Sequence, residues 1–183
     1  MKRITLIIIL LFSLLFSAAA DVHFKAEGDI GLTGTLNIPT ADYLNNVGGA
    51  RAGLSVFSDV DLGIRVDNLS VTAGISVFLN SRTQAYHNLC LKGFVAYGPN
   101  LKLLYSFPSS RFTASLKARM LFCSYFNSQD EFLAFTAETA VGYRLGNPDK
   151  DYLSLIFPIN MTYRKDILGL SFGVGLSVHG GGR

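Results

Sequence analysis

Three histidines, His23, His87 and His179, are the side chains best suited to acid–base chemistry at neutral pH. No two of them have the spacing of a paired metal site. Gly169-Leu-Ser-Phe-Gly173 matches Gly-x-Ser-x-Gly, but it lies within an alternating segment and not at the strand-to-helix turn that would activate its serine. A phosphate-binding loop is missing, because Gly173 and Gly175 lie within an alternating segment and do not precede a helix. We therefore expect no enzyme activity, no catalytic residue, no metal and no cofactor.

The two cysteines, Cys90 and Cys123, have no histidines at zinc-site spacing beside them. They fall on different expected strands, and a disulfide needs Cα atoms about 5.5 to 6 Å apart. We expect free, buried thiols, with a bridge across a narrow interior as the alternative.

The remaining chemistry lies in charged side chains that alternate with apolar ones. Between Asp166 and His179, large apolar residues such as Leu170 and Val174 occupy every second position, and glycine or serine fills the positions between them. Because successive side chains of a strand point to opposite faces, this pattern predicts a strand with one apolar side and one small or polar side.

The same alternation recurs along the chain and predicts ten strands without a helix. Their approximate ranges are 24–36, 50–57, 60–66, 69–79, 86–97, 101–107, 111–126, 131–145, 151–163 and 166–179. Turn residues separate them, among them Ser58-Asp59, Asp67-Asn68, Gly98-Pro99-Asn100 and Pro108-Ser109-Ser110. Eight strands is the alternative, if short early strands merge or lie outside the sheet. Pro158 cannot donate to the ladder, and we expect a bulge there.

The first twenty residues have the pattern of a cleaved signal peptide. Lys2 and Arg3 precede an apolar run, and Ala18-Ala19-Ala20 offers a cleavage site before Asp21. An uncleaved anchor is the alternative. Residues 21–179 then form one domain, and residues 180–183 a flexible tail. Without Lys2 and Arg3 the net charge falls from +3 to +1, and we expect no nucleic-acid partner.

The composition of the less apolar side decides what surrounds the sheet. A water-facing side normally carries about a quarter or more charged residues, whereas this side is mostly Gly, Ser, Thr and Ala. We therefore predict an all-β fold, an antiparallel up-and-down transmembrane β-barrel of the porin-like type in the outer membrane of a Gram-negative cell envelope. A soluble periplasmic barrel or sandwich is the alternative.

In such a barrel the charged side chains point into the lumen, since a charge at the lipid-facing midplane costs about 2–4 kcal/mol. The candidate lumen residues are Lys25, Glu27, Asp29, Arg51, Arg65, Lys92, Lys117, Arg119, Glu138 and Arg144, and the same reasoning adds Asp61, Lys102, Arg111 and Arg164. Ten basic groups against four acidic ones predict a cationic lumen. We expect Glu138 to pair with Arg144 or Lys117. Such a lumen would be either closed by a plug of salt bridges or open as a narrow path for anions.

Two glycine-rich stretches resemble the opening of a known family. Gly31 to Ala41, which ends in Pro-Thr-Ala, and Gly48 to Leu54 are similar to the first strand region of YjbH-type exopolysaccharide-associated outer-membrane proteins. The chain as a whole is also similar to small outer-membrane barrels. Short connections leave little room for an extracellular domain, so we expect a structural role or a narrow channel, and the resemblance adds an accessory role for envelope polysaccharide. The expected partners are outer-membrane lipids, the outer-membrane assembly machinery, and envelope polysaccharide or a small anionic solute. A lipid-modifying enzyme is the remaining alternative.

Overall fold

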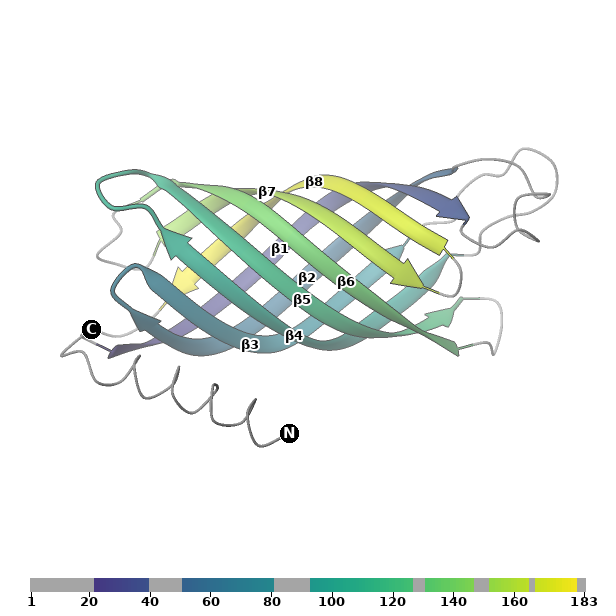
Figure 1. The fold of residues 1–183 in the computed structure, drawn as a ribbon, viewed down its shortest axis with the longest axis horizontal. Coiled ribbons are helices and arrows are strands. Elements are labelled where there is room, and N and C mark those ends of the chain that lie inside the picture. Colours follow the sequence, from purple (N-terminus) through teal and green to yellow (C-terminus); the bar gives the residue numbers. More distant parts are fainter. Residues whose placement is uncertain are drawn as a thin grey trace, which may run out of the picture.

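Eight antiparallel strands form a closed barrel in the computed structural model, which describes residues 22–39, 51–80, 93–126, 131–146, 152–164 and 167–180. The strands are β1 (Val22–Pro39), β2 (Arg51–Val66), β3 (Leu69–Asn80), β4 (Phe94–Ser106), β5 (Phe112–Tyr125), β6 (Glu131–Arg144), β7 (Tyr152–Arg164) and β8 (Ile167–Gly180). Each strand pairs with the next, and β1 pairs with β8, which closes the sheet (Figure 1). The predicted up-and-down barrel is confirmed, with eight strands.

Two of the predicted turns lie in the middle of strands, which is why the expected ten strands become eight. Ser58-Asp59 sits inside β2, and Gly98-Pro99-Asn100 sits inside β4. Asp59 points into the barrel with 1% of its surface exposed, where it meets cationic partners. A polar residue therefore marks the inner face of a strand here and not its end. The predicted turns at Asp67 and Ser109 are observed, and both residues have positive φ angles, 51° and 55°.

The expected bulge at Pro158 is wrong, because the register of β7 is continuous across it. Pro158 pairs with Ala140 of β6, and Ile156 and Ile159 keep one register with β8. The proline ring is fully buried in the interior. Pro158 has no N–H to donate, and pairing between β7 and β8 is interrupted only beside it. The lost hydrogen bonding is therefore local, and the register of the strand does not shift.

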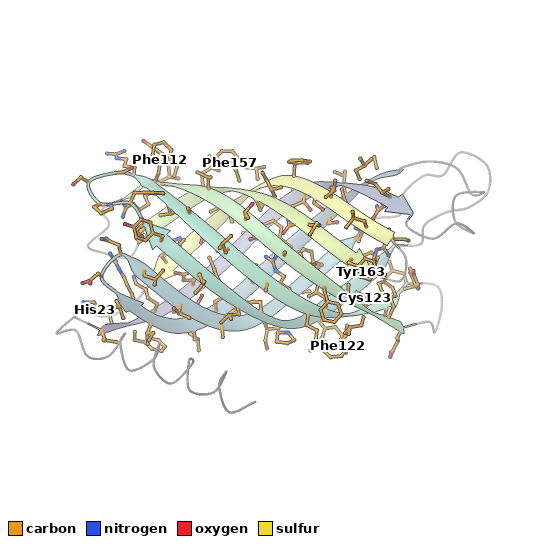
Figure 2. All side chains as sticks on the ribbon, viewed as in Figure 1. His23, Phe112, Phe122, Cys123, Phe157 and Tyr163 are labelled. Carbon is orange, nitrogen blue, oxygen red and sulfur yellow. The ribbon has the colours of Figure 1, made fainter. Side chains whose placement is uncertain are left out.

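The two faces of the sheet are inverted relative to a water-soluble protein. Outward positions carry large apolar side chains, for example Leu54 (66% exposed), Val60 (65%) and Phe172 (63%). Figure 2 shows Phe112, Phe122 and Phe157 projecting away from the barrel wall. Inward positions carry buried polar and charged side chains along every strand. The predicted alternation is confirmed, and it places the polar side inside.

Glycines on the inner face let the strands and one large ring fit a narrow interior. Phe57 is 1% exposed, and Gly31 and Gly175 lie against its ring, so that a Cβ at either glycine would press on the ring and on backbone atoms. At Gly74 a Cβ would overlap the carbonyl oxygen of Val60 and the carboxylate of Asp61. These residues therefore bring the polar side chains of opposite walls within reach.

The two ends of the barrel differ in what fills them. At the terminal end, where β1 begins and β8 ends, Tyr152 and His179 are buried. At the opposite, distal end, Phe94, Leu121 and Cys123 form a small apolar cluster with Ala96 and Ala134. Cys123 is a free thiol, as predicted, and Cys90 lies outside the described residues. Among the described residues no helix is long and apolar enough to cross a membrane.

The close approach at Gly74 predicts that even one methyl group there destabilises the barrel. We expect Gly74→Ala to lower the free energy of unfolding by about 1–3 kcal/mol, because the neighbouring backbone must move. Gly34→Ala is the matched control, since its Cβ would meet only ordinary contact at 3.9 Å, and we expect a change within about 0.5 kcal/mol. Urea unfolding of the refolded protein measures both; equal effects at the two sites would contradict the assignment.

Candidate functional site

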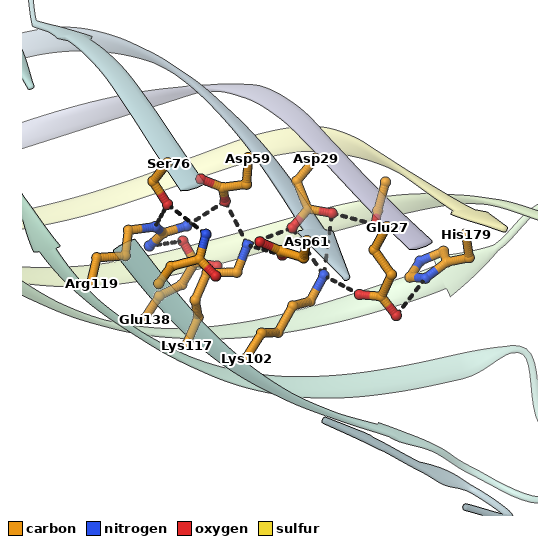
Figure 3. A network of polar contacts seen from close by, with 12 residues as sticks. Glu27, Asp29, Asp59, Asp61, Ser76, Lys102, Lys117, Arg119, Glu138 and His179 are labelled. Carbon is orange, nitrogen blue, oxygen red and sulfur yellow. Dashed lines mark hydrogen bonds and ion pairs between the residues drawn. The ribbon is translucent and has the colours of Figure 1, made fainter. Parts of the chain in front are cut away.

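A network of ion pairs fills the middle of the barrel, and Lys117 is its centre (Figure 3). The Lys117 Nζ atom lies 2.8 Å from Asp29 Oδ2, 2.5 Å from Asp59 Oδ2 and 3.3 Å from Asp61 Oδ2. The side chains of Lys117, Asp59 and Asp61 have no exposed surface. Buried charges of this kind are tolerated only when they are paired, so one ammonium group serves three carboxylates.

Arg119 extends the network toward β6 and the distal half of the barrel. Its Nη2 atom lies 2.8 Å from Asp59 Oδ2 and its Nη1 atom 2.9 Å from Glu138 Oε2. Its Nε donates to Ser76 Oγ at 3.0 Å, and Nη1 also donates to Asn160 Oδ1 at 3.3 Å. The Glu138 partner is therefore Arg119, and the expected pairing with Lys117 or Arg144 is wrong.

Lys102 extends the same network toward the terminal end. Its Nζ atom lies 2.9 Å from both Glu27 Oε2 and Asp29 Oδ2. Glu27 Oε1 in turn lies 3.2 Å from His179 Nδ1, and the His179 ring stacks on Tyr152 with 4.3 Å between ring centroids. A continuous chain of polar contacts thus runs from His179 to Glu138 inside the barrel (Figure 3).

The register explains why these groups meet. The carboxylates Glu27 and Asp61 are cross-strand partners on β1 and β2, as are Asp29 and Asp59. Lys102 and Lys117 are cross-strand partners on β4 and β5. Like charges placed directly opposite each other in a sheet are destabilising, unless opposite charges from another wall neutralise them. An acidic wall made by β1 and β2 therefore faces a basic wall made by β4 and β5 across the lumen.

The central network contains more acid than base. Glu27, Asp29, Asp59, Asp61 and Glu138 are paired there with Lys102, Lys117 and Arg119. The predicted cationic lumen is therefore wrong for this layer. Basic side chains outside it are buried toward the ends, Lys25 and Arg144 at the terminal end and Arg164 at the distal end.

The structure buries seven of the ten predicted lumen residues inside the barrel, namely Lys25, Glu27, Asp29, Lys117, Arg119, Glu138 and Arg144. Arg65 lies at the terminal rim, where its Nε donates to the Asp67 carbonyl at 2.5 Å. Arg144 donates to the carbonyls of Phe107 and Ser110 and so ties down a turn. Lys92 and the side chain of Arg51 lie outside the described residues, and Arg111 is exposed in a turn.

Asp59 is absent from the predicted lumen residues, because a Ser-Asp pair is typical of turns. One signal could have identified it: Asp59 has the same parity along the chain as Ser55, Phe57 and Asp61, so a single strand would place all four on one face. The sequence places His179 at the end of the last predicted strand, and its pairing with Glu27 depends on the β1–β8 closure.

No described contact has the geometry of a catalytic site. His179 is 1% exposed and pairs with Glu27, but no serine hydroxyl of the described residues hydrogen-bonds to its ring. Within the same residues, no group of three or more His, Cys, Asp or Glu side chains is arranged to hold a metal ion. The arrangement is chemically suited to cross-linking the walls of the barrel.

Comparison with known proteins gives the fold alone. No protein-family model matches this chain, and no curated protein matches it. Neisserial surface protein A has a solved structure similar to this one, with a TM-score of 0.52 and 16% sequence identity over 85% of this chain and 96% of that one. Ail, the attachment invasion locus protein of Yersinia pestis, aligns at a TM-score of 0.35 with 10% identity over 85% of this chain and 97% of its own, too low to support an argument. The expected YjbH-type resemblance has no support among these matches.

The central position of Lys117 predicts a large loss of stability when it is removed. We expect Lys117→Met to lower the free energy of unfolding by about 3–5 kcal/mol, since three buried carboxylates lose their shared partner. Arg65→Met at the rim is the control and should change stability by no more than about 0.5 kcal/mol. Urea unfolding curves of the two variants make the comparison, and a Lys117→Met protein as stable as the control would refute the role given to this network.

Proposed function

We propose that this chain is an outer-membrane β-barrel with a structural role and a closed interior. The observation that carries the proposal is the inverted sheet: large apolar side chains outside and buried ion pairs inside. The central charged groups of the interior pair across the lumen, and the outer surface is suited to contact with lipid hydrocarbon.

The apolar exterior favours a membrane over water as the surrounding medium. Soluble monomers rarely expose apolar patches larger than a few hundred Å², whereas here outward apolar side chains cover all eight strands. Transfer of apolar surface from water to hydrocarbon is favourable by about 25 cal/mol per Å². A soluble periplasmic barrel would leave this surface in water, so we place that alternative second.

The ion-pair network supports a sealed barrel over a path for solutes. It joins the acidic wall of β1 and β2 to the basic wall of β4 and β5, and its central side chains have no exposed surface. The distal apolar cluster around Phe94 and Leu121 lines the same lumen further along. An anion path would have to pass a layer in which carboxylates outnumber cations.

Export, an accessory role for envelope polysaccharide and contacts with other proteins do not follow from the ion-pair network. Export by a cleaved signal peptide rests on residues 1–20, which lie outside the described residues. An accessory role for envelope polysaccharide, and contacts with the assembly machinery, rest on the sequence expectations alone. We also propose that the chain is not an enzyme, since the buried His179 lacks a neighbouring serine nucleophile among the described residues.

Cysteine labelling tests the surrounding medium directly. In a Cys90→Ser, Cys123→Ala background, we expect Leu133→Cys and Val174→Cys to resist a water-borne maleimide in vesicles, because hydrocarbon covers these outward positions. Ser109→Cys in the turn between β4 and β5 is the control and should react fully. Equal reaction at all three positions would place water on the outer face and overturn the membrane assignment.

Planar-bilayer recording tests the closed interior. We expect the wild-type protein to add no steady conductance in potassium chloride, since paired buried charges leave no continuous aqueous path. Insertion is checked in parallel by protease protection of the same vesicle-reconstituted protein. A reproducible open current, with selectivity for anions, would instead support the narrow channel.

A further inference from the structure

A second polar region lies at the distal end of the barrel and touches the ion-pair network where Asn160 accepts from Arg119. A cavity of about 40 Å³ opens there inside the lumen. Because a water needs at least about 10–15 Å³ of such space, the cavity holds roughly three waters or one small oxyanion. Its polar and charged lining is Thr33, Thr35, Asn37, Ser55, Asn80, Thr136, Asn160, Thr162, Arg164 and Ser171, a set without a carboxylate.

Most of the hydroxyl and amide groups that line this cavity already have hydrogen-bond partners. Thr35 and Ser171 hydrogen-bond at 2.9 Å, and Thr136 and Thr162 do so at 2.9 Å. Asn80 Nδ2 donates to Ser55 Oγ at 2.6 Å. Asn37 is different, because its buried Nδ2 has no hydrogen-bond partner in the described residues. A free donor is thus aimed at a polar cavity.

Arg164 supplies the second donor. Its side chain is 4% exposed, and its guanidinium lies 4.5 Å from the ring centroid of Phe94 and 5.5 Å from that of Phe132. Its Nη2 makes one long contact, 3.4 Å, to Asn37 Oδ1, and the guanidinium also hydrogen-bonds to the Tyr125 side chain. A guanidinium carries five N–H donors, and no carboxylate of the described residues pairs with this one. The two aromatic rings hold its plane, and after the contacts with Asn37 and Tyr125 some of its five N–H donors remain for a ligand.

We propose that the distal cavity is a binding site for a small oxyanion, such as inorganic phosphate or a free carboxylate. Arg164 and Asn37 present converging donors, and an oxyanion supplies the matching acceptors and the compensating charge. Phe78 also lines the cavity and has Arg119 over its ring at 5.1 Å, but Asp59 and Glu138 already pair with Arg119, so Arg164 is the cation available to a ligand.

A neutral occupant fits the cavity less well. Water or a sugar hydroxyl accepts hydrogen bonds from Asn37 and Arg164 but leaves the buried guanidinium charge uncompensated, and an isolated buried charge is costly. Chloride compensates the charge but lacks two oxygens to match the planar fork. The site thus selects for a negative charge together with two or more acceptor oxygens.

The full chain folded in detergent micelles tests the site, whether or not the protein resides in a membrane. In one titration sodium phosphate replaces sodium chloride at constant ionic strength. In a second titration sodium formate replaces sodium chloride and serves as the carboxylate ligand. We expect the melting temperature followed by circular dichroism to rise with phosphate or formate, because a ligand that binds only the folded state stabilises it. Broadening of the phosphate ³¹P resonance reports the binding directly.

Two variants decide whether the effect belongs to this cavity. Arg164→Gln should weaken binding about tenfold or more, since a hydrogen bond to a charged group is lost, and Arg65→Gln at the opposite rim should bind as the wild type does. Asn37→Ala should weaken binding several-fold and serves as the deciding variant if Arg164→Gln does not fold. Binding unchanged in Asn37→Ala and Arg164→Gln, or no response of the wild type to either oxyanion, would overturn the proposal.

Discussion

The contacts of Lys117 with Asp29, Asp59 and Asp61 are the interaction on which the rest of the barrel depends. The register places carboxylates beside carboxylates on β1 and β2 and lysines beside lysines on β4 and β5. Within either wall alone, the like charges would repel each other. Closure of the sheet brings the two walls face to face, and the repulsion within each wall becomes attraction across the lumen.

Small residues make that attraction geometrically feasible. Gly74 allows β3 to approach the backbone of β2 beside Asp61, and Gly31 and Gly175 leave room for the ring of Phe57. A barrel of eight strands is just wide enough for side chains to fill its interior. Charged side chains of ordinary length therefore meet directly at its centre, and the same narrowness favours a structural role over conduction.

The interior is divided along its length, and its parts differ chemically. The terminal end holds the stacked pair Tyr152 and His179, the middle holds an excess of carboxylates, and the distal end holds Arg164 against two aromatic rings. Lys25 and Arg144 at one end and Arg164 at the other are thus separated from the acidic middle. A solute that matches Arg164 meets a carboxylate-rich layer behind it, so the distal cavity is suited to hold a small anion and not to pass it on.

The fold class follows from the amino-acid sequence alone, because alternation with a period of two depends only on neighbouring residues. The sequence also placed Lys25, Glu27, Asp29, Lys117, Arg119, Glu138 and Arg144 on the polar face, since strand parity is a local property. It did not distinguish a turn from an inward polar residue at Asp59, nor a break from a continuous strand at Pro99, because both readings satisfy the same local chemistry. Only the tertiary structure decided which cation meets which carboxylate: the pairs Arg119–Glu138 and Lys117–Asp59 join residues on separate strands, and their distances follow from the closure and width of the barrel.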